Sequence, residues 1–276
     1  MSAPALFART WGQGPPVVLL HGLGASSRYW EPLAEASSGY AAVAPDLLGF
    51  GRSPKPPCAS YDVACHLEAL APLLPAGAAV VVGHSTGAIL AAALAAARPR
   101  SVAALLLLGL PAFADEATAR REVGRLGLLA RLTVDGNPLA RTLCIAMCRL
   151  RPLATAIAPV LMRDLPPSIA ADGALHTWAS YHRTLEGVVL GHRVADDLGA
   201  LAVPVTLLHG ERDTTAPVHY VRALTDEVGV AGVRTELHVV DGDHHLAVRQ
   251  PSAVARALAP LLRAPPSSPG QGAPDA

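Results

Sequence analysis

Short apolar runs that end at a glycine or an aspartate recur along this chain, and they constrain its fold more than any other feature. The runs cover residues 17–20, 41–44, 80–82, 103–108, 205–208 and 234–240. Most are continuously apolar and do not alternate between apolar and polar residues. That pattern is typical of parallel strands that are buried on both faces of a sheet.

Alanine- and leucine-rich stretches separate several of these runs and have the length of helices. They cover residues 86–97, 218–228 and 252–262, and Ser252 is suited to cap the last of them. Because strands and helices alternate along the chain, the sequence predicts an α/β fold. We expect a mostly parallel sheet with helices on both faces.

One long stretch interrupts this alternation. No strand-like run occurs between about residues 113 and 199, where several helical segments are separated by prolines. We interpret residues 113–199 as a helical cap inserted into a core made of residues 1–112 and 200–263. Residues 264–276 are rich in proline, serine and glycine, which predicts a disordered tail.

Composition excludes several classes of protein. Hydrophobic residues make up 51% of the chain, which excludes disorder of the whole. Lys+Arg and Asp+Glu both number 22, so the basic surplus of a nucleic-acid-binding protein is missing. Lys55 is the only lysine, and no Gly-Lys-Ser/Thr triplet of a phosphate-binding loop occurs.

The cysteines and the termini give no sign of secretion. The chain has four cysteines and none forms a Cys-x-x-Cys pair. Cys144 and Cys148 are four residues apart, and we interpret these two as small apolar core residues, with a bridge or a metal pair as the lesser option. The first ten residues do not resemble a secretory signal, and polar residues interrupt the most apolar windows, 78–97 and 102–113. We therefore expect a cytoplasmic protein without stable membrane insertion.

The segment Gly83-His84-Ser85-Thr86-Gly87 carries the clearest chemical signal. It directly follows the valine-rich strand and begins an alanine-rich helix, which is the context of a G-x-S-x-G nucleophile elbow. The tight turn strains the serine backbone, and flanking glycines avoid side-chain collisions. Ser85 is therefore the candidate nucleophile. The N–H of Thr86, at the start of the helix, is a candidate donor to an oxyanion.

A serine hydroxyl needs an adjacent base, which in turn needs a group to orient it. Asp213 follows the strand at residues 205–208, and His244 and His245 follow the last strand. Both loops leave carboxyl ends of strands, as Ser85 does. The order Ser, Asp, His matches that of serine hydrolases with a nucleophile elbow.

These motifs together resemble the α/β-hydrolase family over about residues 10–262. The resemblance rests on His21-Gly22-Leu23-Gly24, the segment from Pro45-Asp46 to Arg52-Ser53, the elbow, Asp213, and Gly242-Asp243-His244 with Pro251 seven residues later. It implies a Ser-His-Asp hydrolase with a helical cap, and a second oxyanion N–H from Leu23. The spacing to Pro251 selects His244 as the base, with His245 in the pocket lining.

The resemblance and the serine nucleophile predict hydrolysis of a carboxylic ester or lactone through an acyl-serine. Members that use an aspartate nucleophile, the haloalkane dehalogenases and epoxide hydrolases, do not fit Ser85. One alternative is carbon–carbon bond hydrolysis of a diketone. Another is a slow or non-catalytic small-molecule-binding protein of the same fold. We expect a small acyl substrate and water as partners, no cofactor, no metal and no nucleic acid. The natural substrate and the oligomeric state stay open.

Some of these residues also fit two other kinds of site. Gly22-Leu23-Gly24 with Asp46 could mimic a dinucleotide-binding loop, and Asp241, Asp243, His244 and His245 could form a metal site. We instead interpret Asp46 as stabilising its turn, His21 as orienting the oxyanion loop and His84 as a packed histidine. The arginines of residues 120–151 suggest solvated helix faces, with an anionic substrate or membrane surface as the lesser option.

Overall fold

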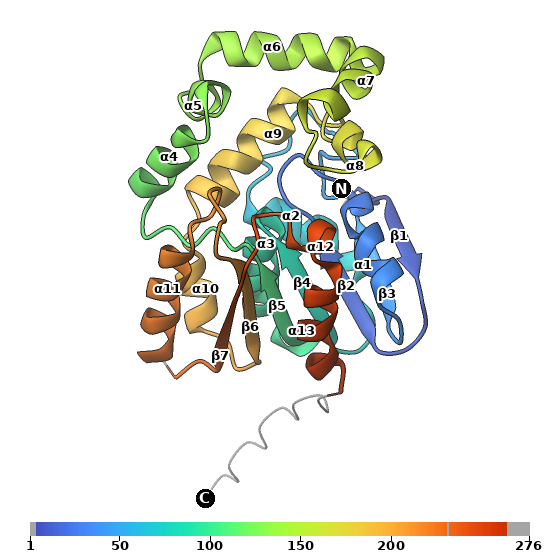
Figure 1. Cartoon of the computed structure of the whole chain (residues 1–276), viewed down its shortest axis with the longest axis vertical. Helices are drawn as coiled ribbons and strands as arrows, with labels where there is room; N and C mark the ends of the chain where they lie inside the picture. Colours follow the sequence, from blue (N-terminus) through green and yellow to red (C-terminus); the bar gives the residue numbers. More distant parts are fainter. Residues whose placement is uncertain (1–3, 231, 264–276) are drawn as a thin grey trace, which may run out of the picture.

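The computed structural model describes residues 4–230 and 232–263, and its centre is a seven-stranded sheet (Figure 1). The strands are β1 (Ala8–Trp11), β2 (Pro16–Leu20), β3 (Ala41–Pro45), β4 (Ala79–His84), β5 (Val102–Leu108), β6 (Val205–Gly210) and β7 (Thr235–Val240). Their order is β1-β3-β2-β4-β5-β6-β7. All neighbouring pairs are parallel except β1 and β3.

The predicted α/β class and mostly parallel sheet are confirmed, and one strand was missed. β1 is a four-residue edge strand that pairs antiparallel with β3. Its residues are only half-buried or exposed, so it has no continuous apolar run of the kind that marks the inner strands. The predicted tail, residues 264–276, lies outside the described residues.

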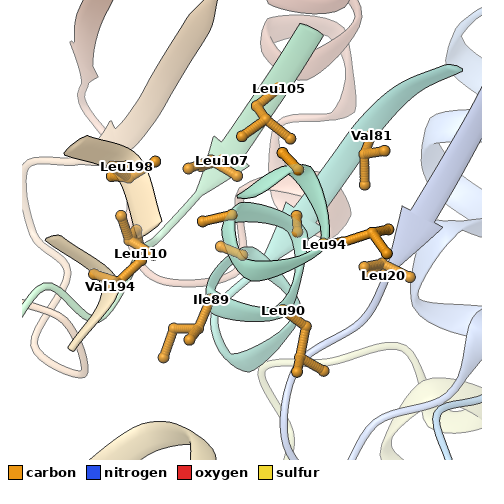
Figure 2. Close-up of a cluster of buried hydrophobic side chains, with 14 of the residues drawn as sticks. Leu20, Val81, Ile89, Leu90, Leu94, Leu105, Leu107, Leu110, Val194 and Leu198 are labelled. Atoms are coloured by element: carbon orange, nitrogen blue, oxygen red, sulfur yellow. The ribbon is translucent and has the colours of Figure 1, made fainter. Parts of the chain in front are cut away.

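Alternate residues of each inner strand face opposite sides of the sheet and form two hydrophobic clusters. Val18, Leu20 and Val81 pack in the cluster around α3 (Thr86–Ala97) (Figure 2). Val17 and Leu19 belong to the other cluster, on the opposite face. This alternation explains why the inner strands are apolar along most of their length.

Helices cover both faces. Beside α3, the first cluster takes residues from α2 (Val63–Leu70), α10 (Val194–Gly199) and α11 (Val218–Val230). The second cluster involves α1 (Glu31–Ala36), α12 (Leu246–Arg249) and α13 (Pro251–Arg263). Short 3-10 turns occur at η1 (Ser27–Trp30), η2 (Ala71–Leu73) and η3 (Pro99–Ser101).

A group of helices lies above one end of the sheet (Figure 1). They are α4 (Glu116–Arg125), α5 (Leu128–Val134), α6 (Pro138–Arg149), α7 (Arg151–Leu161), α8 (Pro167–Asp172), α9 (Trp178–Thr184) and the π-helical segment η4 (Leu185–Leu190). We call α4 to η4 the cap helices. The next helix, α10, packs against α3 and α11 of the core. The proposed domain limits at residues 113 and 199 stay a prediction.

Polar contacts tie the cap helices to a loop of the core. Asp172, at the end of α8, accepts a hydrogen bond from Ser26 Oγ at 2.6 Å and forms an ion pair with Arg28 at 3.0 Å.

Within the described chain, no single helix has the length and apolar character needed to cross a membrane. Only α6 and α7 taken together pass that test, and they are bent by 111° where they meet.

Candidate active site

Ser85 lies in the turn between β4 and α3 with a strained backbone. Its φ is 53° and its ψ is −120°, a conformation that residues other than glycine rarely adopt. A Cβ atom at Gly83 would lie 2.3 Å from the carbonyl oxygen of Gly87, and one at Gly87 would lie 2.1 Å from that of Leu20. Both flanking positions therefore require glycine, because a methyl group would collide with backbone atoms.

A cavity of about 270 Å³ lies between the sheet and the cap helices, and Ser85 and His244 both line it. The cap contributes mostly apolar side chains, among them Leu126, Met162 and Tyr181. Among the residues that the structure describes, no lysine, arginine, aspartate or glutamate lines the cavity. The cavity is thus an apolar pocket with a few polar groups at one end, as small-molecule sites usually are.

Asp213, which is buried, and His244, which is half-buried, form a pair at the carboxyl ends of β6 and β7. His244 Nδ1 donates to Asp213 Oδ2 at 2.8 Å, while Asp213 Oδ1 accepts from the N–H groups of Thr215 and Ala216 at 2.9 and 2.8 Å. Burial acts to raise the pKa of Asp213, but the hydrogen bonds from His244 and the Ala216 N–H outweigh it and lower the pKa. Asp213 is therefore an ionised acceptor that fixes a proton on His244 Nδ1.

Ser85, the predicted nucleophile, lies beside this pair without a hydrogen bond to it. Ser85 Oγ forms no hydrogen bond with another side chain or carbonyl of residues 4–230 or 232–263. Ser85 and His244 nevertheless line the same cavity, and the ring of His84 lies 4.7 Å from that of His244 between centroids. Contacts between nucleophile and base are often loose in enzymes without substrate.

His244 and His245 occupy different environments. Of the two, His244 is hydrogen-bonded to Asp213, whereas His245 Nδ1 is buried without a partner in the described part of the chain. Burial, reinforced by the neighbouring His244, lowers the pKa of His245 to about 4. His245 lines the cavity as a neutral ring. The geometry favours His244 as the base.

His84 holds the loop that carries His244. Its Nε2 lies 2.8 Å from the carbonyl oxygen of His244, and its ring stacks on Tyr29 with centroids 4.5 Å apart. Complete burial lowers the pKa of His84 well below its usual value, so the ring is neutral and Nε2 donates to the carbonyl. His84 is packed and hydrogen-bonded, as its interpretation from the sequence required.

Leu23 and Thr86, the predicted oxyanion donors, both line the cavity beside Ser85. Thr86 is the first residue of α3, so its N–H has no carbonyl partner within the helix. The N–H of Leu23 has no acceptor among the described backbone groups. Gly22 brings the loop close, since a Cβ there would lie 3.2 Å from Ser85 Cβ.

His21 and Asp46 connect this loop to the segment after β3. His21 Nε2 accepts the Leu47 N–H at 2.9 Å, so Nδ1 carries the proton and donates to the carbonyl of Gly22 at 2.8 Å. Both oxygens of Asp46 accept backbone N–H groups, from Ser27 and Arg52. Asp46 is also buried, so a ribose could not reach it, which argues against a dinucleotide site.

Two residues that pack around the Asp213–His244 pair were not identified from the sequence. Gly109, at the end of β5, has a φ of 52°, and a Cβ there would lie 3.1 Å from His244 Nδ1. His209 Nε2 lies 2.5 Å from the Ala216 carbonyl and 3.5 Å from Asp213 Oδ2, so it supports the loop that holds Asp213. The only indication in the sequence was that this glycine and this histidine stand at the ends of two apolar runs.

Other acidic groups near the site have partners. Asp241 pairs with Arg212, and Asp243 pairs with Arg249 at 2.7 Å. No three histidine, cysteine or acidic side chains of the described ranges are grouped to hold a metal ion. In the cap, Glu186 pairs with Arg120.

The fold matches that of one known family. A family model for the alpha/beta hydrolase fold matches residues 15–137, which include the Leu23 loop and the Ser85 elbow. This chain is an α/β-hydrolase-fold protein. The resemblance seen in its motifs is thereby confirmed at the level of the fold.

Known proteins show several degrees of similarity to this chain. The chain is 43% identical to lipase LipV of Mycobacterium tuberculosis over 123 residues, which cover 43% of the chain and 46% of LipV. It is 26% identical to "Probable lysophospholipase BODYGUARD 1" of Arabidopsis thaliana over 264 residues, covering 84% of the chain and 55% of that protein. The chain thus spans about half the length of these curated relatives.

Among solved structures, a thermophilic esterase from Thermogutta terrifontis superposes with a TM-score of 0.67 at 24% identity. The superposition covers 94% of this α/β-hydrolase-fold chain and 93% of the esterase. At that identity the likeness establishes the fold alone.

Proposed function

We propose that this chain is a serine hydrolase that cleaves a carboxylic ester through an acyl-serine intermediate. The observation that carries the proposal is the half-buried hydrogen bond from His244 Nδ1 to Asp213, beside the cavity that His244 and Ser85 both line. It leaves the Nε2 lone pair of His244 free to take a proton.

In the first half-reaction, Ser85 Oγ attacks the ester carbonyl while its proton passes to His244 Nε2. The carbonyl oxygen becomes an oxyanion that accepts the N–H groups of Leu23 and Thr86, each contributing on the order of 3 kcal/mol. Asp213 stabilises the imidazolium. The tetrahedral intermediate then collapses, the alcohol leaves with the proton from His244, and the acyl group stays on Ser85.

In the second half-reaction, water enters the vacated position and gives a proton to His244 Nε2 as its oxygen attacks the acyl carbon. The same two N–H groups hold the new oxyanion. Collapse breaks the bond to Ser85 Oγ, which recovers its proton from His244. The products are a carboxylic acid and the regenerated enzyme.

The lining of the cavity indicates the substrate class. Its cap side is apolar, and it offers no cation to a charged acyl group. An ester or lactone with a neutral, apolar acyl chain therefore fits better than one with a carboxylate on that chain, whose burial would lack a partner. The names of LipV, a lipase, and of the Thermogutta esterase are in line with an ester substrate.

The test is Ser85→Ala with p-nitrophenyl esters of increasing acyl length. We expect near-complete loss of turnover with an unchanged circular dichroism spectrum. The wild type is expected to prefer a neutral butyryl or octanoyl ester over a hemisuccinyl ester. Turnover retained by the Ser85→Ala protein would refute the proposal, and so would a folded wild type that hydrolyses no ester or lactone.

A further inference from the structure

The exposed apolar side chains of this protein are concentrated in one segment of the cap. All twelve large hydrophobic residues that are exposed in the described ranges lie between positions 126 and 162. They are Leu126, Leu128, Leu129, Leu139, Leu143, Met147, Leu150, Leu153, Ile157, Val160, Leu161 and Met162. We call them the apolar cap surface. Isolated exposed leucines are ordinary, but such a concentration marks an interaction surface.

These residues follow helical spacing on two successive helices. On α6, Leu139, Leu143 and Met147 are four residues apart, while Ala140 and Cys144 are buried on the inner side. On α7, Leu153, Ile157 and Leu161 repeat the same interval. Each helix thus presents an apolar stripe away from the protein (Figure 1 shows α6 and α7 at the outer end of the cap).

The charges around this surface are almost all positive. Between residues 126 and 163 there are five arginines and one acid, Asp135. The arginines are Arg131, Arg141, Arg149, Arg151 and Arg163, and none forms an ion pair with another residue of the described chain. The arginines of α4 differ, because Arg120 pairs with Glu186 and Arg125 with Glu122. Unpaired arginines beside an apolar face complement an anionic, amphiphilic surface.

The apolar cap surface continues into the cavity. Leu126 and Met162, at its two ends in the sequence, also line the pocket of Ser85 and His244. Leu161 and Met162 line a second hollow together with His244 and His245. An apolar chain that leaves a surface in contact with α6 and α7 therefore meets apolar side chains along the way to Ser85.

We propose that the apolar cap surface docks the protein onto an anionic lipid–water interface. The stripes of α6 and α7 enter the region between headgroups and acyl chains, and the arginines contact lipid phosphates. Docking would place the cavity entrance at the interface. This goes beyond the proposed ester hydrolysis and does not depend on it.

A second copy of the chain is a less suitable occupant. A symmetric dimer through this face would bring both sets of five arginines together with one acid from each copy to compensate them. Anionic headgroups supply the missing negative charge.

The experiment measures co-sedimentation with vesicles of phosphatidylglycerol and phosphatidylcholine in equal parts, and with vesicles of phosphatidylcholine alone. The apolar variant is L143S/I157S and the charge variant is R141E/R149E. The matched control is R222E/R256E, which makes the same charge change at exposed arginines of α11 and α13. None of these six side chains lines the cavity. Unchanged turnover of p-nitrophenyl acetate therefore shows that each variant is folded. The Ser85→Ala protein, which lacks the nucleophile, shows whether docking occurs without catalysis.

We expect tight binding of the wild type and of Ser85→Ala to the anionic vesicles. Binding should weaken about tenfold for L143S/I157S and on the order of 100-fold for R141E/R149E, but little for R222E/R256E. The inference is wrong if the wild type stays in solution, or if both cap variants bind as it does. It is also wrong if sedimentation velocity shows a dimer that L143S/I157S dissociates without any binding to vesicles.

Discussion

Replacing Asp213 by asparagine tests the proposed role of the Asp213–His244 pair at the level of single protons. Oδ1 accepts two backbone N–H groups, from Thr215 and Ala216, so it must remain an oxygen. The amide NH₂ of Asp213→Asn would then occupy the position of Oδ2, facing His244 Nδ1. Since an NH₂ group donates, Nδ1 would become the acceptor and the proton of His244 would move to Nε2.

The size of the effect follows from that tautomer. A histidine with its proton on Nε2 cannot accept the proton of Ser85. The equivalent change in serine proteases, where the geometry also survives, lowers kcat by about 10⁴-fold, or about 5.5 kcal/mol. We expect a loss of the same order here, with KM nearly unchanged because Asp213 does not line the cavity.

A second Asp–His pair in the same chain provides a matched control. His192 Nε2 lies 2.6 Å from Asp197 Oδ2, and neither residue lines the cavity. Asp197→Asn removes the same charge from the same kind of pair without touching the site. Steady-state hydrolysis of p-nitrophenyl butyrate should therefore be normal in this variant. The reasoning fails if Asp213→Asn keeps turnover within about tenfold of the wild type, a loss too small for the wrong tautomer, or if both variants lose the same amount.

Three further outcomes can be measured independently. Gly83→Ala should lower the free energy of unfolding in urea by on the order of 3 kcal/mol, because its Cβ collides with backbone; Gly77→Ala, where no atom lies within 4 Å, should not, and equal effects would contradict the collision. Burial lowers the pKa of both His66 and His176 to about 4. Between pH 6.5 and 4 the unfolded chain therefore binds more protons than the folded chain. The free energy of unfolding should fall by on the order of a few kcal/mol per histidine as the pH is lowered from 6.5 to 4; a free energy of unfolding that stays level from pH 7 to 4 would contradict this. Treatment with EDTA should leave ester turnover unchanged, and a loss that zinc restores would point to a metal site instead.

The sequence revealed the inner sheet because burial on both faces leaves a continuous apolar run. It missed β1, where a half-buried edge strand leaves no such run. The elbow was recognisable because the backbone itself demands Gly83 and Gly87. The choice between His244 and His245 as the base depends on which of them contacts Asp213 in three dimensions, and residue types alone could not establish that contact.

The surface of the cap could not be predicted from the sequence. The absence of strand-like runs predicted helices there, but an apolar stripe on a helix normally faces a core, and the stripes of α6 and α7 face outward. The arginines of the cap appeared equivalent in the sequence. Only the structure separates Arg120, which is paired with Glu186, from Arg141 and Arg149, which are not paired within the described chain.

Mass spectrometry of the enzyme quenched during turnover tests the central claim most directly. With p-nitrophenyl butyrate in excess, the peptide that contains Ser85 should gain the mass of one butyryl group, and the adduct should disappear as substrate is exhausted. The Ser85→Ala protein should gain none. Turnover without any adduct, or an adduct on another residue that forms and decays at the rate of turnover, would contradict the proposed acyl-serine mechanism.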